Sequence, residues 1–470
     1  MADCRTDARA ARRSRARHRQ RSPARFDEID RERVSLAGAV AINCIAMIGI
    51  GPLLTIPLVL GSLHGPLSLA GWIGGALLAL CDGLVWAELG SAYPRSGGTY
   101  GYFLGIFGSR GIGRMLAFLF VWQLIFVTPL TIATGYIGFA NYAGYLVPAL
   151  ATNPLALKLV AVAVGIVTVV SLYRGIKAIE KISIILGVCS VVALLCVTAA
   201  SFARWSPHLA AQLGPGDVWG GLRAGLGPAL VIAMYDYMGY YAANLIAGEV
   251  AVPHRTLPRS ILIAIAIVAT LYITMQAGVL GAIPWQQFVP LADGTLPPLG
   301  QHLSSAIVER VAGAPAAIAL TVLILVTAFA STFAVLLGAS RVPQAAARDG
   351  NFPRIFAHEN KREKFPDVSL AVMGGVALIA CFFTLDQVIN ALTAGIVLTQ
   401  GIGQVAVLFV LRARGVRAPY RMWLFPLPAI VALAGWVYIF ASSGVPAMLL
   451  GVLSIVLGMG VYRLSVLRAR

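Results

Sequence analysis

Apolar residues recur in stretches of about 20 along nearly the whole chain from Val34 onward, and short polar links separate them. An α-helix of about 20 apolar residues is long enough to cross the hydrocarbon core of a bilayer. The pattern therefore predicts twelve membrane-spanning helices and an all-α integral membrane protein. These helices are predicted at residues 34–60, 67–92, 114–139, 155–173, 182–203, 223–247, 259–282, 314–339, 367–385, 388–411, 424–442 and 446–462.

The composition supports the same class of protein. Of the 470 residues, 59% are hydrophobic and 12% are charged, whereas soluble domains have about 45–50% apolar and about 25% charged residues. No link is long enough for a separate soluble domain, so residues 34–470 are predicted to form one membrane domain. The cysteines beyond Cys4 lie in apolar stretches without the spacing of metal ligands, so we expect neither a disulfide framework nor a metal site.

Residues 1–33 form an arginine-rich tail with no apolar run that would bury a core, and we expect this tail to be disordered. Such a tract can bind nucleic acid or anionic lipid, or act as a transit peptide. Acidic residues such as Asp27 and Glu28 weigh against a transit peptide. The positive-inside rule favours a cytoplasmic tail beside membrane lipid, and no nucleic-acid partner is expected.

Lysine and arginine are concentrated in every second link, and the links between are nearly free of both. The positive-inside rule places the basic links in the cytoplasm. Both termini are therefore predicted to be cytoplasmic, in a multi-pass protein of the cytoplasmic membrane. The basic links hold Arg95, Arg110 and Arg114; Arg174, Lys177 and Lys181; Arg255 and Arg259; residues 341–364; and residues 412–421.

The first apolar stretch contains MIGIGPLLTIP at residues 47–57, where Gly49, Gly51 and Pro52 weaken a helix. A helix broken inside a membrane leaves backbone N–H and C=O groups unpaired, which is tolerated only where they line a cavity or meet a ligand. The free N–H groups of Gly49, Ile50 and Gly51 suit a carboxylate, and free carbonyls suit an ammonium group. Together these preferences indicate a zwitterionic amino acid.

A second interruption is predicted in the sixth stretch, ALVIAMYDYMGYYAANLIAGEV, where Gly239 lies among four tyrosines. The tyrosines either pack the helix or close over a substrate. Interruptions at matching positions, five helices apart, indicate an inverted-repeat transporter with its site between the halves. The halves are predicted at about residues 34–203 and 223–411.

Three acidic residues lie in or near predicted helices: Asp82 and Glu88 in the second, and Asp236 in the sixth. A charge in hydrocarbon is costly unless it faces protein or water, so each is a candidate site residue. The alternative is a role in helix packing, which we favour for Glu88 because it lies near the cytoplasmic end of its helix. Asp236 is left with three roles: to take up a coupling proton, to bind a cationic substrate, or to hydrogen-bond a neighbouring helix.

Four separated motifs resemble those of the amino acid-polyamine-organocation permeases, and within them bacterial relatives of the L-amino acid transporters. They are GIGPLLTIP, AELGSAYPRSGGTYGYF, AGEVAVPHRTLPRSI and SRVPQAAARDGNFPRIF, in the order of that family. The resemblance implies a LeuT-like fold of five plus five inverted helices, with discontinuous first and sixth helices and two extra helices at about residues 424–462.

The resemblance also implies a substrate site. In this site the carboxylate-binding turn corresponds to Gly49, Ile50 and Gly51, and the unwound part of the sixth helix corresponds to Met238, Gly239 and Tyr240. The aromatic lid corresponds to Tyr235. A polar lining from the third helix is expected at Gln123, Thr128 and Thr131.

The chain departs from the family in the carboxylate-binding turn and in the fifth helix. Ile50 replaces the usual serine of the turn, and the region around Cys189 lacks the lysine that many relatives carry in the fifth helix. The sequence AFAST ends in Ser331 and Thr332, in an order similar to the sodium-binding pattern of this fold, although such hydroxyls also bond their own helix. Coupling to H⁺ or Na⁺ therefore stays open, and no other cofactor is expected.

Enzyme and channel motifs are missing from the sequence. It contains no Gly-x-Ser-x-Gly, His-Glu-x-x-His or P-loop pattern, and no filter loop or ring of charge. We therefore expect a secondary active transporter that moves an amino acid by alternating access. The alternatives are a polyamine or organic-cation permease of the same fold, and a sensor that binds but does not transport.

Overall fold

The computed structural model describes residues 33–95, 97–173, 179–214, 216–291, 295–360 and 365–467. Each of the twelve predicted ranges overlaps apolar helix in this part of the chain, with bounds that differ by several residues. Eight helical segments are long and apolar enough to cross a membrane, and a bent pair gives a ninth. The predicted tail, residues 1–33, lies almost entirely outside the described residues.

The eight long segments are α5 (Ser68–Ala92) with the preceding turn, α7 (Ile112–Leu146), α9 (Pro154–Tyr173), α12 (Val218–Tyr237), α14 (Pro253–Ala282), α16 (Leu303–Arg348), α18 (Leu385–Ile396) continued by α19 (Gly403–Ala413), and α21 (Val445–Leu467). The helices α10 (Ile179–Ala203), α17 (Asp367–Ala380) and α20 (Leu427–Ser442) occupy the three remaining predicted ranges and contribute shorter apolar segments. Short helices connect them: α6 (Thr99–Phe107), α8 (Pro148–Ala151), α11 (Pro207–Ala210), α13 (Ala242–Leu245) and α15 (Pro298–Gln301).

The predicted break in the first span is confirmed. It separates α3 (Leu36–Met47) from α4 (Gly51–Leu63), and the two helices meet at 52°. Ser35 caps the start of α3, where its hydroxyl accepts a hydrogen bond from the N–H of Gly38 at 3.2 Å. Pro52 stands in the first turn of α4, the position in a helix where a missing N–H costs least. The sequence around the break thus ends one helix and starts the next.

The structure corrects the bounds of the eighth helix. Hydropathy predicts residues 314–339, but helical structure runs from Leu303 to Arg348 and bends at Gly313, whose φ is 79°. The extra turns continue into the polar RVPQAAAR segment because backbone hydrogen bonds maintain a helix whether or not its side chains are apolar. A helix can therefore extend past the membrane that its apolar part spans.

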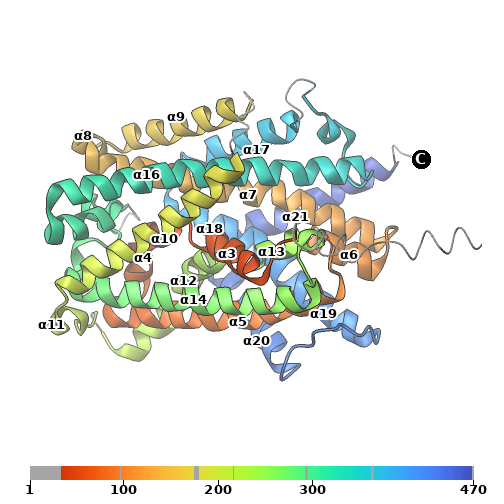
Figure 1. The fold of residues 1–470 in the computed structure, drawn as a ribbon, viewed down its shortest axis with the longest axis horizontal. Helices are drawn as coiled ribbons and strands as arrows, with labels where there is room; N and C mark the ends of the chain where they lie inside the picture. Colours follow the sequence, from red (N-terminus) through yellow and green to blue (C-terminus); the bar gives the residue numbers. More distant parts are fainter. Residues whose placement is uncertain are drawn as a thin grey trace, which may run out of the picture.

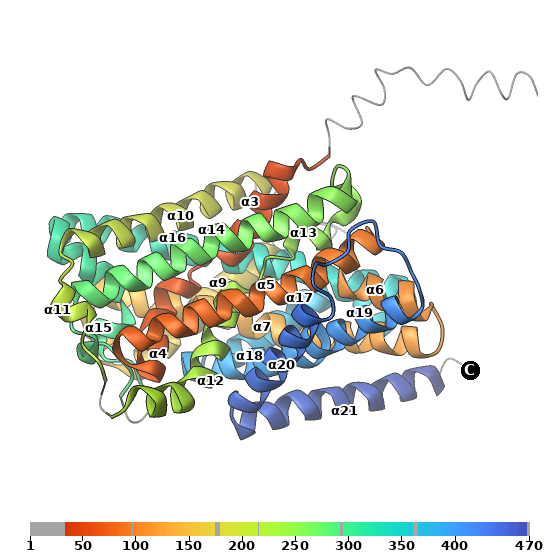
Figure 2. The same ribbon diagram turned by 90° about the horizontal axis from the view of Figure 1, so that it is seen from below.

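The interrupted helices lie inside the bundle. Figure 1 shows α3, α12 and α13 between α16 on one side and the neighbouring helices α5 and α14 on the other, and α21 lies along an outer edge in Figure 2. Small residues allow close approach: a Cβ on Gly75 of α5 would come within 2.9 Å of Ala233 of α12. The break in the first span is therefore enclosed by protein.

Two of the acidic residues predicted within helices hold neighbouring helices together. Asp82 accepts hydrogen bonds from the Tyr240 hydroxyl at 2.5 Å and from the Trp436 indole at 2.9 Å. Glu88 is fully buried and pairs with Arg412 of α19, whose Nη2 donates to Oε2 at 2.7 Å. Each carboxylate thus has polar partners from other helices, which offsets the cost of its burial.

Candidate functional site

Two backbone N–H groups at the break in the first span have no backbone partner. Gly49 donates to the carbonyl of Met47 at 3.0 Å, but Ile50 and Gly51 donate none of the backbone hydrogen bonds found between the described segments. Both N–H groups lie at the start of α4, which is the positive end of its dipole. A Cβ built on Gly49 would meet no atom within 4 Å, so space is open beside this turn. The turn has the geometry of an anion site.

The second interruption rests directly on the first. The helix α12 ends at Tyr237, and Gly239 follows with a φ of 119°, a conformation that favours glycine. A Cβ on Gly239 would lie 2.7 Å from the carbonyl carbon and oxygen of Ala46. Only glycine allows the two backbones to approach this closely, so the second break packs against the last turn of α3, next to the first break. The two breaks together form the unwound region.

Tyr272 of α14 lies where the two unwound segments meet, and sequence reasoning missed it. Its hydroxyl donates to the carbonyl of Met47 at 2.9 Å and lies 3.4 Å from the carbonyl of Asp236. These carbonyls belong to the ends of α3 and α12, where helical partners are lacking. Its stretch also holds Thr270, Thr274 and Gln276, so the sequence did not single Tyr272 out or reveal its partners.

Tyr235 is positioned by a hydroxyl of α7. Its phenol oxygen lies 2.7 Å from Oγ1 of Thr134, further along α7 than the predicted Thr128. Tyr235 and Met238 also pack, partly buried, against an apolar cluster whose buried members are Val127, Leu392 and Ile396. Residues from α7, α12 and α18 therefore form an apolar wall beside the unwound region.

The side chains of Asp236 and Tyr235, both residues of α12, lie beside the start of α4. Its side chain is 2% exposed, and its Oδ2 accepts a hydrogen bond from Thr55 at 2.5 Å. Its Oδ1 has no partner and lies 2.3 Å from the position of a Cβ built on Gly51. Helical spacing separates Asp236 from Tyr235 by about 100°, yet both side chains reach Gly51 because it lies between them.

The remaining predicted residues are more dispersed. Tyr240 is fully buried and its hydroxyl binds Asp82. Gln123 and Thr128 are buried in α7. The hydroxyls of Ser331 and Thr332 donate to carbonyls of their own helix, at 3.1 Å to Ala328 in both cases, although hydroxyl oxygens engaged in this way keep lone pairs for a cation.

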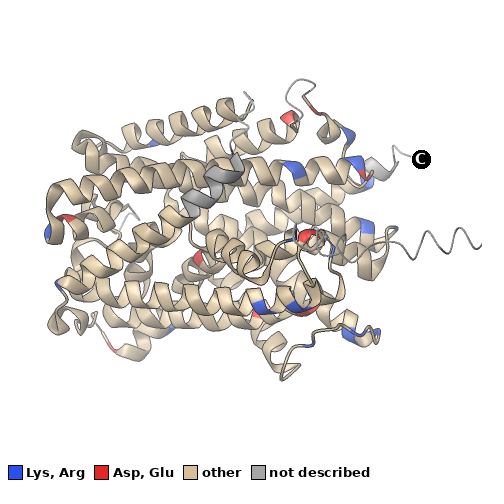
Figure 3. Ribbon diagram, viewed as in Figure 1, with Lys and Arg blue, Asp and Glu red and all other residues tan. Residues whose placement is uncertain are grey.

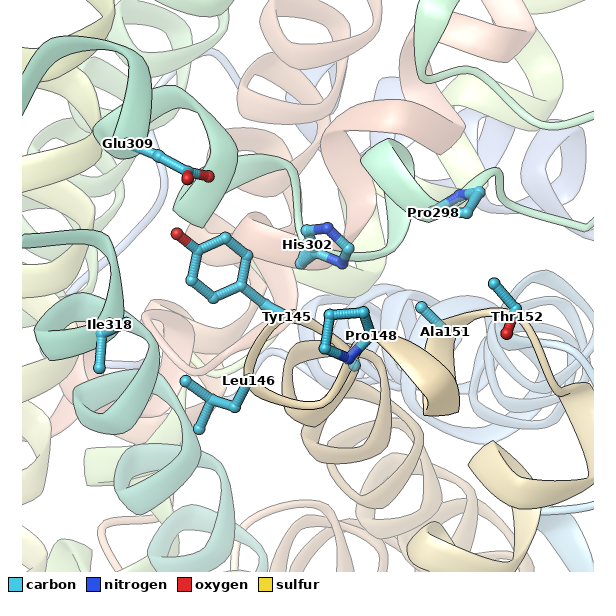
Figure 4. A pocket seen from close by; sticks show the side chains of 10 residues that line it. Tyr145, Leu146, Pro148, Ala151, Thr152, Pro298, His302, Glu309 and Ile318 are labelled. Carbon is cyan, nitrogen blue, oxygen red and sulfur yellow. The ribbon is translucent and has the colours of Figure 1, made fainter. Parts of the chain in front are cut away.

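A separate cavity of about 470 Å³ lies at the C-terminal end of α7 (Figure 4). Tyr145, His302 and Glu309 contribute its polar lining, and the rings of Tyr145 and His302 meet edge to face at 5.4 Å. Burial lowers the pKa of His302. None of the residues that line this cavity is a predicted substrate residue.

Apolar helices that include a broken span, with a second break packed beside it, are typical of membrane transport proteins. The amino acid permease family matches residues 34–459, and the chain belongs to this family. The family and the relatives described next are transporters rather than enzymes, so the protein is a multi-pass membrane permease of amino acid transport.

Three relatives illustrate the range of the family. The chain is 27% identical to the branched-chain amino acid permease BcaP of Bacillus subtilis over 79% of each protein. It is 27% identical to mouse solute carrier family 7 member 12 over 81% of this chain and 80% of the relative. It is 23% identical to the serine/threonine exchanger SteT of Bacillus subtilis over 84% of this chain and 86% of the relative.

Proposed function

We propose that the protein is a secondary active transporter that moves an amino acid across the cytoplasmic membrane by alternating access. The observation that carries the proposal is the unwound region, where the free N–H groups of Ile50 and Gly51 lie at the positive end of α4. These groups suit a carboxylate, and the carbonyl end of α3 suits an ammonium group. An amino acid carries both groups.

The proposed topology has twelve spans with a LeuT-like arrangement. The shorter apolar helices α10, α17 and α20 supply the spans that complete the predicted set. The inverted halves are residues 34–203 and 223–411, with two further helices at residues 424–462. Lysine and arginine gather toward the end of the bundle where α6 and the C-terminus lie (Figure 3), which supports cytoplasmic termini.

The substrate proposed is an amino acid with an apolar side chain. Its carboxylate lies at Gly49, Ile50 and Gly51, and its side chain contacts the apolar wall beside Tyr235 and Met238. The buried members of that wall, Val127, Leu392 and Ile396, provide no polar partner for a charged or hydroxylated side chain. The name of BcaP, a branched-chain amino acid permease, is consistent with this choice.

Asp236 favours a second candidate function, the transport of a polyamine or another organic cation. A buried carboxylate with a free oxygen beside the cradle is a partner for an ammonium group. A polyamine lacks a carboxylate, however, and leaves the N–H groups of Ile50 and Gly51 unpaired. That cost, about 1–3 kcal/mol for each buried group, favours the amino acid.

The test is substrate exchange in proteoliposomes that contain the purified protein. Vesicles loaded with an unlabelled amino acid should take up the same labelled compound, and apolar amino acids should exchange faster than charged amino acids or polyamines. Exchange of polyamines alone would support the second candidate. Binding without any exchange would identify a sensor and refute transport.

If a sodium gradient drives transport, we assign the sodium site to Ser331 and Thr332. Their hydroxyls and a carbonyl of the first span would provide the oxygen ligands that sodium prefers. An imposed sodium gradient that drives accumulation, and that loses its effect in Thr332→Val, would support this role. Accumulation that does not respond to the sodium gradient would refute this role of Ser331 and Thr332.

A further inference from the structure

Asp236 occupies the same helix end as the proposed substrate carboxylate. Its carboxyl group lies against Gly51 at the start of α4, and Thr55 in the next turn of α4 donates to its Oδ2. The free N–H groups of Ile50 and Gly51 belong to that same turn. The positive end of one helix therefore faces an acidic side chain and the expected site of a second carboxylate.

Two carboxylates at one site cannot both be ionised without strong repulsion, and a buried site offers little screening. No lysine, arginine or histidine of the described residues forms an ion pair with Asp236 to relieve this repulsion. Oδ2 is occupied by Thr55, whereas Oδ1 is buried and free to carry a proton. Neutral Asp236 thus permits the second carboxylate to bind.

The other titratable groups near Asp236 do not provide a positive charge. They are phenols: Tyr235 and Tyr237 on α12, and Tyr272 on α14. Cys44 of α3 lies beside Tyr272 and also carries no positive charge.

We propose that Asp236 is the proton-coupling site: substrate binds when Oδ1 of Asp236 holds a proton, so one proton crosses the membrane with each amino acid. The proton comes from water on the side to which the unwound region is open, forms the O–H bond at Oδ1, and returns to water on the other side. This inference rests on the proposed function.

The position of Asp236 also argues against binding the substrate's ammonium group. A cation next to the start of α4 would face the positive end of the helix dipole, which is unfavourable. The carbonyl end of α3 lies at the other side of the turn and is the better partner for an ammonium group. A proton at Oδ1 makes the carboxyl neutral and avoids both conflicts.

The test compares Asp236→Asn with the parent protein and with Asp386→Asn. Asp386 is a carboxyl near the start of α18 that binds Asn390 and lies outside the proposed site, so it controls for the loss of an acid. Proteoliposomes receive an imposed proton gradient and a labelled apolar amino acid. The parent and Asp386→Asn should accumulate it, whereas Asp236→Asn should lose accumulation at least about tenfold but retain exchange at equal pH.

Three results would overturn the proposal: accumulation by Asp236→Asn equal to that of the parent, accumulation lost equally in Asp386→Asn, or a parent that exchanges substrate but ignores the proton gradient. A parent that does not exchange any amino acid would instead refute the proposed function. The two failures are therefore distinguishable.

A binding measurement on the parent decides the matter if Asp236→Asn does not fold. Substrate affinity should fall as the pH rises between about pH 5 and about pH 9, a range wide enough for a carboxyl in a perturbed environment. Thr55→Val removes the hydrogen bond that favours the ionised form, so the fall should move to higher pH. An affinity of the parent that stays constant over this range overturns the proposal.

Discussion

Gly49→Ala tests whether the first break holds the substrate, because the added methyl group enters open space. A Cβ at Gly49 would meet no protein atom within 4 Å, and Gly49 is not among the glycines with positive φ. Replacing glycine by alanine at such a position is expected to leave the free energy of unfolding unchanged or to raise it by about 0.4–1 kcal/mol. A loss of binding would then reflect the site and not the fold.

The size of the effect follows from the fit of the carboxylate. Its oxygens must approach the N–H groups of Ile50 and Gly51 to hydrogen-bond distance, and the methyl group lies beside that approach. Overpacking of a filled site by one methyl group costs about 1–3 kcal/mol. This cost corresponds to substrate affinity that is about fivefold to about 150-fold weaker.

The assay is equilibrium binding of a labelled amino acid to the purified protein, paired with thermal unfolding in the same detergent. Gly375→Ala is the matched control, since a Cβ there also meets nothing within 4 Å but lies on α17, away from the unwound region. Both variants should unfold at or slightly above the temperature of the parent. Unchanged affinity in Gly49→Ala would refute the assignment of the cradle to this turn.

Three further substitutions probe the contacts around the site. Gly239→Ala strains a residue at a φ of 119° and places a Cβ 2.7 Å from the Ala46 carbonyl. We therefore expect size-exclusion chromatography to show little folded protein, and a normal yield would contradict the backbone contact. Glu88→Gln leaves Arg412 without its counter-charge and should lower stability by about 3 kcal/mol, seen as a lower unfolding temperature, whereas an unchanged temperature would contradict the pairing. Tyr235→Phe loses one hydrogen bond to α7 and should weaken substrate binding by about 0.5–1.5 kcal/mol, and full affinity would show that this bond does not position the ring.

The sequence was sufficient for features that depend on local chemistry. The order of apolar stretches placed the long apolar helices but not the short connecting ones, and Gly49, Gly51 and Pro52 placed the break because glycine and proline weaken a helix wherever they occur. The bend at Gly313 was not predicted, since Gly313 lies just before the apolar stretch at 314–339 that hydropathy assigned to the eighth helix.

The contacts of the candidate site depend instead on how each helix is rotated about its axis. Thr55 and Asp236 are 181 positions apart in sequence, and Tyr272 reaches Met47 from a helix that carried no predicted site residue. Neighbouring helices set these rotations through packing, which hydropathy does not encode. The predicted substrate residues thus stay predictions until binding is measured, but the structure identifies the polar partners that position them.

The contact between Gly239 and Ala46 limits how the transporter can move. The two backbones are too close to slide past one another at this point, so we expect α3 and α12 to move together in the proposed transport cycle. Spin labels on α3 and α12 should keep a constant separation through the transport cycle, while their distances to a label on α16 change.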